Sequence, residues 1–207
     1  MTLIQRAHQA RVHSRRVHIL AEHLDALLPA GASVLDVGSG DGLLASLVLA
    51  RRPDLVWSAL DTLERATTHV PVQLFDGRRL PCTDKQHDVV LFVDVLHHAE
   101  DPLELLREAV RVARSALVIK DHLREGLAAG PTLRFMDWVG NAGYGVNLPY
   151  NYWSAAQWAH ARAELELHVE DERRALGLYP WWADWLFGRS LHFIARFGVP
   201  GEPRPRP

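Results

Sequence analysis

The sequence predicts an α/β fold in which a mostly parallel sheet is covered by helices on both faces. Short apolar segments alternate along most of the chain with longer segments whose apolar residues recur every three or four positions. The joins between them are short, and the run Gly38-Ser-Gly-Asp-Gly42 turns one apolar segment directly into a helical one. Alternation of this kind is typical of parallel strands joined by crossover helices.

Local signals support the individual elements. Residues 3–28 carry apolar side chains at steps of three and four and end before Pro29-Ala-Gly31, which predicts a long helix. Asp101-Pro-Leu-Glu104 combines an N-cap aspartate, a first-turn proline and a glutamate at the third position, which predicts a helix start. The other predicted helices are 43–51, a short one over 61–68, and 154–162. The predicted strands are 33–37, 55–60, 72–75, 88–95, 116–120, 165–169 and 191–197.

Composition and charge restrict the function classes. The 207 residues include 23 basic and 25 acidic side chains, a formal net charge of −2, so nothing favours nucleic acid as a partner. The single cysteine, Cys82, excludes a disulfide framework and a cysteine-ligated zinc site, and it is typical of a reducing compartment. No apolar run reaches the roughly 18 residues of a membrane span, and early arginines argue against a signal peptide. We expect a cytoplasmic protein without integral membrane association.

Aspartates follow the predicted strands at the edge where open parallel sheets bind ligands. Asp36 precedes the glycine run, Asp61 closes the second strand, Asp76 with Gly77 follows the third, and Asp94 lies near the end of the fourth. Asp61 stands 23 residues after Gly38, close to the spacing of a carboxylate that binds ribose hydroxyls. These side chains therefore predict a nucleoside-binding edge.

The glycine pattern bears on the type of nucleoside. A dinucleotide site favours G-x-G-x-x-G, which would place a third glycine at position 43, where this chain has leucine. The sequence has G-x-G-x-G, and it lacks a catalytic Tyr-x-x-x-Lys pair. An oxidoreductase that uses NAD(P) is therefore the less favoured interpretation.

Over residues 15–122 the sequence resembles the class I S-adenosylmethionine-dependent methyltransferases. The resemblance rests on four motifs, VLDVGSGDG, LDTLERA, FDGRRLP and DVVLFVDVLHHAEDPLELLREAVRVA. It implies a Rossmann-like sheet of seven strands, in the order 3-2-1-4-5-7-6 with the last strand antiparallel. It also implies that the cofactor is S-adenosylmethionine, held by Asp36, Gly38, Ser39, Gly40, Asp61, Thr62, Asp76, Gly77, Asp94 and Val95.

The resemblance also suggests how the chain is organised. We expect residues 1–198 to form a single domain, in which the N-terminal helix 3–28 precedes a cofactor-binding half over 29–122. A lid and substrate region follows over 123–198, and residues 199–207, rich in proline and arginine, form a disordered tail. The region 123–153 lacks helical or strand periodicity and is rich in aromatic residues, so it forms either a lid that covers the substrate or a plain satellite core.

Candidate catalytic residues are histidines at the functional edge, because imidazole accepts protons near neutral pH. His97 and His98 follow the fourth strand and His122 ends the fifth. No metal is expected, although Asp94, Asp121 and Asn147 stand in an order that permits Mg²⁺.

Candidate substrate residues lie in the aromatic segment. They are Tyr144, Tyr150, Tyr152 and Trp153. The motif Asn147-Leu-Pro-Tyr150 resembles one that nucleic-acid adenine methyltransferases place after the fourth strand, but here it follows the fifth. We therefore expect methyl transfer to a small, rather apolar acceptor. The alternatives are a catalytically silent cofactor-binding module, the NAD(P)-linked oxidoreductase and a nucleic-acid methyltransferase.

Overall fold

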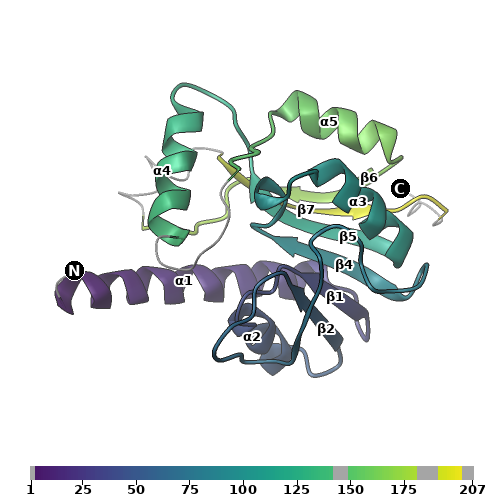
Figure 1. Ribbon diagram of the computed structural model, residues 1–207, viewed down its shortest axis with the longest axis horizontal. Coiled ribbons are helices and arrows are strands. Elements are labelled where there is room, and N and C mark those ends of the chain that lie inside the picture. Colours follow the sequence, from purple (N-terminus) through teal and green to yellow (C-terminus); the bar gives the residue numbers. More distant parts are fainter. Residues whose placement is uncertain (1–2, 142–148, 181–190, 202–207) are drawn as a thin grey trace.

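The computed structural model describes residues 3–141, 149–180 and 191–201 and shows one sheet flanked by helices (Figure 1). The helices are α1 (Leu3–Leu27), α2 (Leu43–Arg51), the short 3₁₀ helix η1 (Leu96–His98), α3 (Pro102–Val112), α4 (Ala129–Asn141) and α5 (Ala155–Glu164). The strands are β1 (Ser33–Val37), β2 (Val56–Asp61), β3 (Val72–Leu74), β4 (His87–Val93), β5 (Ala113–His122), β6 (His168–Arg173) and β7 (His192–Gly198).

The sheet has the predicted topology. Its order is β3-β2-β1-β4-β5-β7-β6, and the first five strands run parallel, whereas β7 is antiparallel to both β5 and β6. The predicted fold class is therefore confirmed. Because β1, β2 and β4 run in the same direction, their carboxyl ends meet at one edge of the sheet.

Each face of the sheet has its own hydrophobic core. One core joins α1 and α2 to the sheet through residues such as Leu24 and Val48. The other joins α3 and α5 to the opposite face through Leu106 and Trp158. In Figure 1, α1 and α2 lie below the sheet and α3 and α5 above it, while α4 is drawn above the N-terminal half of α1. Buried strands on a doubly covered sheet explain the nearly continuous apolar runs.

Two predicted elements were wrong. The helix expected over 61–68 does not form: Asp61 accepts the backbone N–H of Leu63, and the segment continues as bends and turns. The strand expected over 165–169 begins later, at His168, because α5 extends to Glu164 and the chain then turns at Glu166, whose φ is 53°.

Other boundaries also differ from expectation. The segment 123–153, expected to lack regular structure, contains α4; its Pro131 lies in the first turn, where no intrahelical N–H is needed. Strand β4 ends at Val93, since Asp94 has a φ of 57°. Val199, the first residue of the expected tail, is buried, and its N–H donates to the carbonyl of Ser115.

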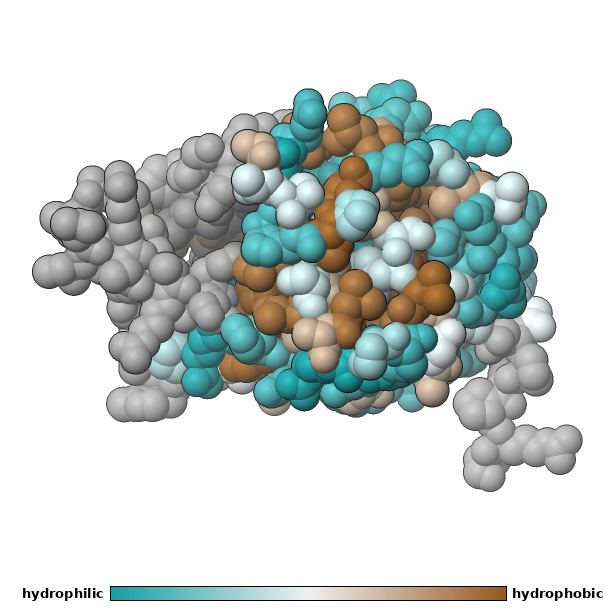
Figure 2. Space-filling model, turned by 90° about the horizontal axis from the view of Figure 1, so that it is seen from below, coloured by the Kyte–Doolittle hydropathy of each residue, from teal (hydrophilic) through white to brown (hydrophobic). Residues whose placement is uncertain are grey.

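The edge of the sheet at β2 and β3 is partly apolar. Val56 and Leu74 are exposed on these strands, and Figure 2 shows hydrophobic surface among hydrophilic residues on the side where α2 and β2 lie.

Among the described residues, no helix has the length and apolar character required to cross a bilayer.

Candidate functional site

The glycine turn and Asp61 meet at the carboxyl edge of the sheet. The N–H groups of Gly38 and Ser39 donate to the carbonyl of Leu60 at 2.8 and 2.9 Å. The Gly40 N–H donates to Asp61 Oδ2 at 2.7 Å, and the Leu63 N–H donates to Asp61 Oδ1 at 2.8 Å. The buried Asp61 carboxylate therefore holds the turn after β1 and its own loop after β2 together.

Two glycines of this turn are required by their surroundings. Gly38 has a φ of 77°, and a Cβ at this position would overlap the side chain of Val95. Gly42 has a φ of 75°, and its Cβ would meet Val70. The turn thus approaches the loop after β4 more closely than any residue with a side chain allows.

Asp36 lies under the same turn and is 4% exposed. Burial raises the pKa of Asp36 to about 7; the nearby Ser39 and Trp57 side chains lower it, and the charge of Asp61 raises it further. The site therefore contains a carboxyl group that changes charge near neutral pH.

The third aspartate of the predicted edge is more exposed. Asp76 Oδ1 accepts the N–H groups of Arg78 and Arg79, both at 2.8 Å, and these bonds lower the pKa of Asp76. Its neighbour Gly77 has a φ of 78° and approaches Thr62, because a Cβ at Gly77 would lie 3.1 Å from Thr62 Cγ2. The loops after β2 and β3 are therefore in contact.

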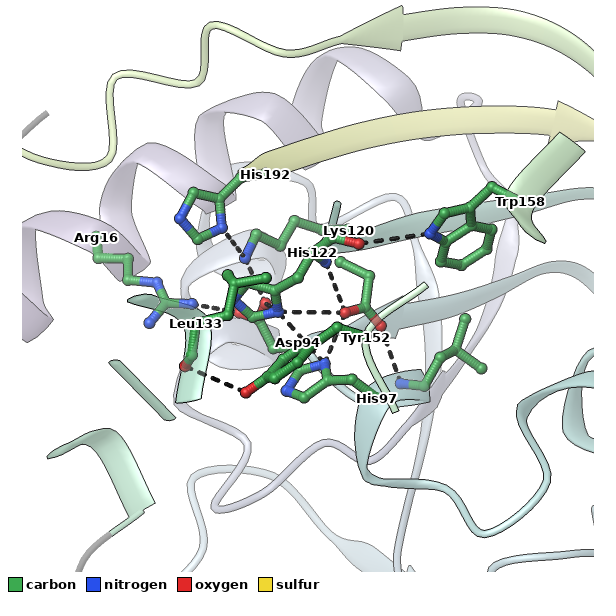
Figure 3. A network of polar contacts seen from close by, with 11 residues as sticks. Arg16, Asp94, His97, Lys120, His122, Leu133, Tyr152, Trp158 and His192 are labelled. Atoms are coloured by element: carbon green, nitrogen blue, oxygen red, sulfur yellow. Dashed lines mark hydrogen bonds and ion pairs between the residues drawn. The ribbon is translucent and has the colours of Figure 1, made fainter. Parts of the chain in front are cut away.

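Asp94 takes part in an ion-pair network. Its carboxylate pairs with the Lys120 ammonium and with the Arg16 guanidinium, which comes from α1 (Figure 3). Burial alone would raise the pKa of Asp94, but Lys120 and Arg16 outweigh it and hold the pKa well below its usual range. The Lys120 side chain is fully buried, and its Nζ lies 3.3 Å from His192 Nδ1.

The three candidate histidines lie beside this network. His97 Nδ1 is 2.6 Å from Asp121 Oδ1, and His122 Nδ1 lies 3.3 Å from the same oxygen. The His98 ring centroid is 4.0 Å from that of His97. Burial, together with the charges of Lys120 and His97, lowers the pKa of His122 to about 4, so His122 is neutral at pH 7.

Asp121 organises the end of β5. Its Oδ2 accepts the N–H of Leu96 at 3.0 Å, which fixes η1 against β5. Burial would raise the pKa of Asp121, but His97 and His122 outweigh it and lower the pKa, so this carboxylate is ionised. His97 is thus paired with a buried anion, an arrangement that orients an imidazole and stabilises its protonated form.

A cavity of about 350 Å³ lies against Tyr152, a neighbour of His97. Its lining residues come from the segment after β5, from α4 and from the chain before α5; they are Arg124, Gly130, Pro131, Arg134, Tyr150 and Tyr152. The Tyr152 ring stacks on His97, with ring centroids 5.2 Å apart and planes 23° apart. Of the predicted substrate residues, the structure brings Tyr150 and Tyr152 to this cavity.

The other predicted substrate residues are placed differently. Trp153 packs edge-on against Trp158, with centroids 5.0 Å apart, in the core under α5. Tyr144 and Asn147 lie outside the described residues. The aromatic segment is therefore divided between a cavity wall and the hydrophobic core.

Comparison with known proteins identifies the family. The family described as "Methyltransferase domain" matches residues 6–172, most of the chain. The chain belongs to the S-adenosylmethionine-dependent methyltransferases.

Individual relatives are distant. A methyltransferase from Mesorhizobium loti, whose name states S-adenosylmethionine dependence, has a TM-score of 0.64 and 16% identity, over 86% of this chain and 96% of that one. A chain of the complex between the Haloferax volcanii Trm112 methyltransferase activator and a methyltransferase has a TM-score of 0.67 and 18% identity, over 93% of both chains. These similarities show the shared fold.

The similarity to a curated sequence is partial. A ubiquinone biosynthesis O-methyltransferase from Aliivibrio fischeri (strain MJ11) is 26% identical over 114 residues, which are 50% of this chain. The chain matches 48% of that relative's length.

The residues at the sheet edge fit the cofactor of a methyltransferase. S-adenosylmethionine carries ribose hydroxyls, an ammonium and a sulfonium, and carboxylates accept from or attract all of these groups. Gly38 has no side chain, which is why the backbone of the turn can lie so close to Val95. The family assigns the cofactor, and Asp36, Gly38, Gly40 and Asp61 are the residues we expect to hold it.

The histidine cluster also has the composition of a metal site. The potential ligand atoms of His97, Asp121 and His122 lie within 4.8 Å of one another. However, Lys120 already occupies the neighbouring Asp94 carboxylate with a positive charge, and Asp121 accepts from backbone as well as from histidine. The Nδ1 atoms of His97 and His122 both lie within hydrogen-bond distance of Asp121 Oδ1.

Sequence reasoning missed several residues at the site. Lys120 stands at the end of an apolar strand, and Arg16 belongs to the predicted N-terminal helix, in which no site residue was expected. Arg124 and Arg134 lie in the segment for which no periodicity was found. The available signal was a lysine that closes an otherwise uninterrupted apolar run, which indicates either an exposed strand end or a buried ion pair.

Proposed function

We propose that the protein transfers the methyl group of S-adenosylmethionine to a small acceptor with ring or acyl character, bound between η1 and the cavity at Tyr152. The observation that carries this proposal is the stacking of Tyr152 on His97, because it joins an aromatic cavity wall to the loop that follows Val95 and the glycine turn. A small cavity that includes two tyrosine side chains suits a small molecule rather than a polymer.

Different residues bind and position the parts of the cofactor. The cofactor supplies an activated methyl group on a sulfonium. Asp61 binds the ribose, and the turn at Gly38 and Gly40 positions the methionine part next to Asp36. With the cofactor fixed, the main remaining requirement is to hold the accepting atom in line with the methyl group and to exclude water.

An oxygen acceptor would also have to lose a proton. The name of the Aliivibrio fischeri relative describes O-methylation, and we extend that reaction type to this chain. Asp121 accepts from His97 Nδ1–H, so Nε2 is the nitrogen that takes the proton. His122, with a pKa of about 4, is too weak a base for this role at pH 7.

Methyl release into a panel of acceptors tests the function. The purified chain is incubated with S-adenosylmethionine carrying a labelled methyl group and with small phenols, aromatic carboxylates, amines and thiols, and a short RNA is included. Methylation of a small compound, reduced at least tenfold in Asp61→Ala, supports the proposal. Labelling of the RNA alone overturns it, and cofactor binding without transfer to any compound favours a cofactor-binding module.

The composition also supports a cellular location. A single cysteine that is partly buried is typical of a reducing compartment, and we propose that the enzyme acts in the cytoplasm.

A further inference from the structure

The cavity beside Tyr152 is positively charged. Two of its lining side chains are arginines, Arg124 and Arg134, and none of the lining residues that the structure describes is acidic. In the described part of the chain neither guanidinium forms an ion pair, whereas most exposed arginines, such as Arg107 with Glu164, do. Glu125, next to Arg124 in sequence, uses its carboxylate to accept the N–H of Ala155 at 2.9 Å.

The start of α4 adds to this positive character. Gly130 lies in the first turn of this 13-residue helix and lines the cavity. The first backbone N–H groups of a helix have no intrahelical acceptor and carry partial positive charge. Of the two residues of this turn that line the cavity, Gly130 carries a backbone N–H and Pro131 does not.

The tyrosines hold the cavity in place. The Arg134 guanidinium carbon lies 5.5 Å from the centre of the Tyr150 ring, so the ring restricts the arginine. The Tyr152 hydroxyl donates to the carbonyl of Leu133 at 3.2 Å, which ties the chain before α5 to α4. Tyr152 also stacks on His97, so the positive cavity and the proposed proton acceptor share one aromatic wall.

We propose that this cavity binds an anionic group of the methyl acceptor, a carboxylate or a phosphate, through Arg124, Arg134 and the N-terminus of α4. The acceptor is then an aromatic or acyl compound that carries a negative charge at the end remote from the accepting atom. Guanidinium groups bind both anions with paired hydrogen bonds, which a neutral ligand cannot match. This inference rests on the proposed function, because it assigns the cavity to the acceptor.

Binding of model anions tests the inference without requiring the true acceptor. Calorimetric titrations use benzoate, its neutral counterpart benzamide, and inorganic phosphate, with and without saturating S-adenosylhomocysteine. We expect benzoate to bind at least tenfold more tightly than benzamide. Arg124→Gln and Arg134→Gln should each lower the affinity for benzoate three- to tenfold and should have little effect on the affinity for benzamide. Phosphate binding that is lost in the same variants would show that the anion alone is recognised, and benzoate binding without phosphate binding would assign the site to carboxylates.

The control is Arg107→Gln, which removes an exposed arginine of α3 and should leave benzoate affinity unchanged. Equal affinities for benzoate and benzamide, or benzoate binding that survives both cavity substitutions, would overturn the inference. Titration of S-adenosylhomocysteine separates the two proposals. If it binds and the anions do not, the anion site alone fails; if it does not bind, the proposed function fails, whatever the anions do.

Discussion

Asp61 and Gly40 are joined directly, since the Gly40 N–H donates to Asp61 Oδ2 at 2.7 Å. The other carboxylate oxygen accepts the N–H of Leu63. The residue expected to bind the cofactor ribose therefore also fixes the glycine turn against the loop after β2. We therefore expect cofactor binding and local stability to be coupled through the Asp61 side chain.

Replacing Asp61 by alanine should weaken S-adenosylhomocysteine binding at least tenfold, because a charged acceptor for the ribose hydroxyls is lost. It should also lower the free energy of unfolding by about 1–3 kcal/mol, because two backbone donors lose their partner. Calorimetry and urea unfolding measure the two effects. Asp101→Ala is the control: it removes the N-cap of α3, at a cost of about 1 kcal/mol, and should leave affinity intact. Equal affinities of the two variants would refute the placement of Asp61.

Gly38 should tolerate no side chain. Gly38→Ala adds both a positive-φ penalty and an overlap with Val95, so we expect a loss of more than about 2 kcal/mol in the free energy of unfolding. Gly31→Ala has a similar φ, 68°, with nothing within 4 Å of its Cβ, and should cost only about 1 kcal/mol. The double variant Gly38→Ala/Val95→Ala should recover the difference between them. Urea unfolding of the wild type and the three variants measures these free energies. Equal losses for the two single glycine variants would show that the overlap with Val95 is relieved at no cost.

Asp36 should make stability depend on pH near neutrality. Burial raises its pKa from the usual 3.8 to about 7, so between these values the folded protein keeps a proton that the unfolded chain releases. The contribution of Asp36 to stability therefore falls as pH rises through this window. Asp36→Asn removes the effect, and the variant should gain up to about 4 kcal/mol relative to wild type between pH 4 and pH 8. Urea unfolding across this range measures the difference, which should change with pH; a constant difference would contradict the burial of an ionisable Asp36.

The pairing of His97 with Asp121 predicts a particular pH–rate profile. For an acceptor that loses a proton, kcat/KM should rise with pH as the imidazole becomes neutral, and His97→Gln should lower kcat about 100-fold and remove this inflection. Asp121→Asn keeps the shape of the side chain but removes the negative charge that stabilises the His97 imidazolium, so the inflection should move to lower pH. A merely structural role for the pair would leave the inflection where it is. Persistence of the inflection in His97→Gln would assign it to another group.

The sheet could be predicted because its determinants are local. Buried parallel strands require continuous apolar runs, and the turn after β1 requires glycines, so both are visible in short windows of sequence. Strand β6 was misplaced because it lies at the sheet edge and carries four consecutive charged residues, 170–173, so no apolar run forms. Helix α4 was missed because Gly130 and Pro131 stand in its first turn, where they cost little.

The polar network could not be predicted for a different reason. Arg16 and Asp94 are 78 positions apart, and Lys120 is a further 26 positions from Asp94. Which charges meet depends on how α1 crosses the sheet edge, and no periodicity encodes that crossing. Asp94 was expected to lie beside the cofactor as an acceptor, whereas its carboxylate is engaged by two cations, and it is the neighbouring Val95 that approaches the glycine turn.

This network should be the most sensitive polar element of the fold. Asp94→Asn leaves the fully buried ammonium of Lys120 without its carboxylate, and an uncompensated buried charge costs about 3–5 kcal/mol. The double variant Asp94→Asn/Lys120→Met removes both charges and should regain most of the lost stability. Arg107→Gln breaks an exposed pair and should change stability by less than about 1 kcal/mol. Urea unfolding of these proteins and of Lys120→Met alone gives the coupling energy of the buried pair, and additive losses in the double variant would show that Lys120 does not depend on Asp94.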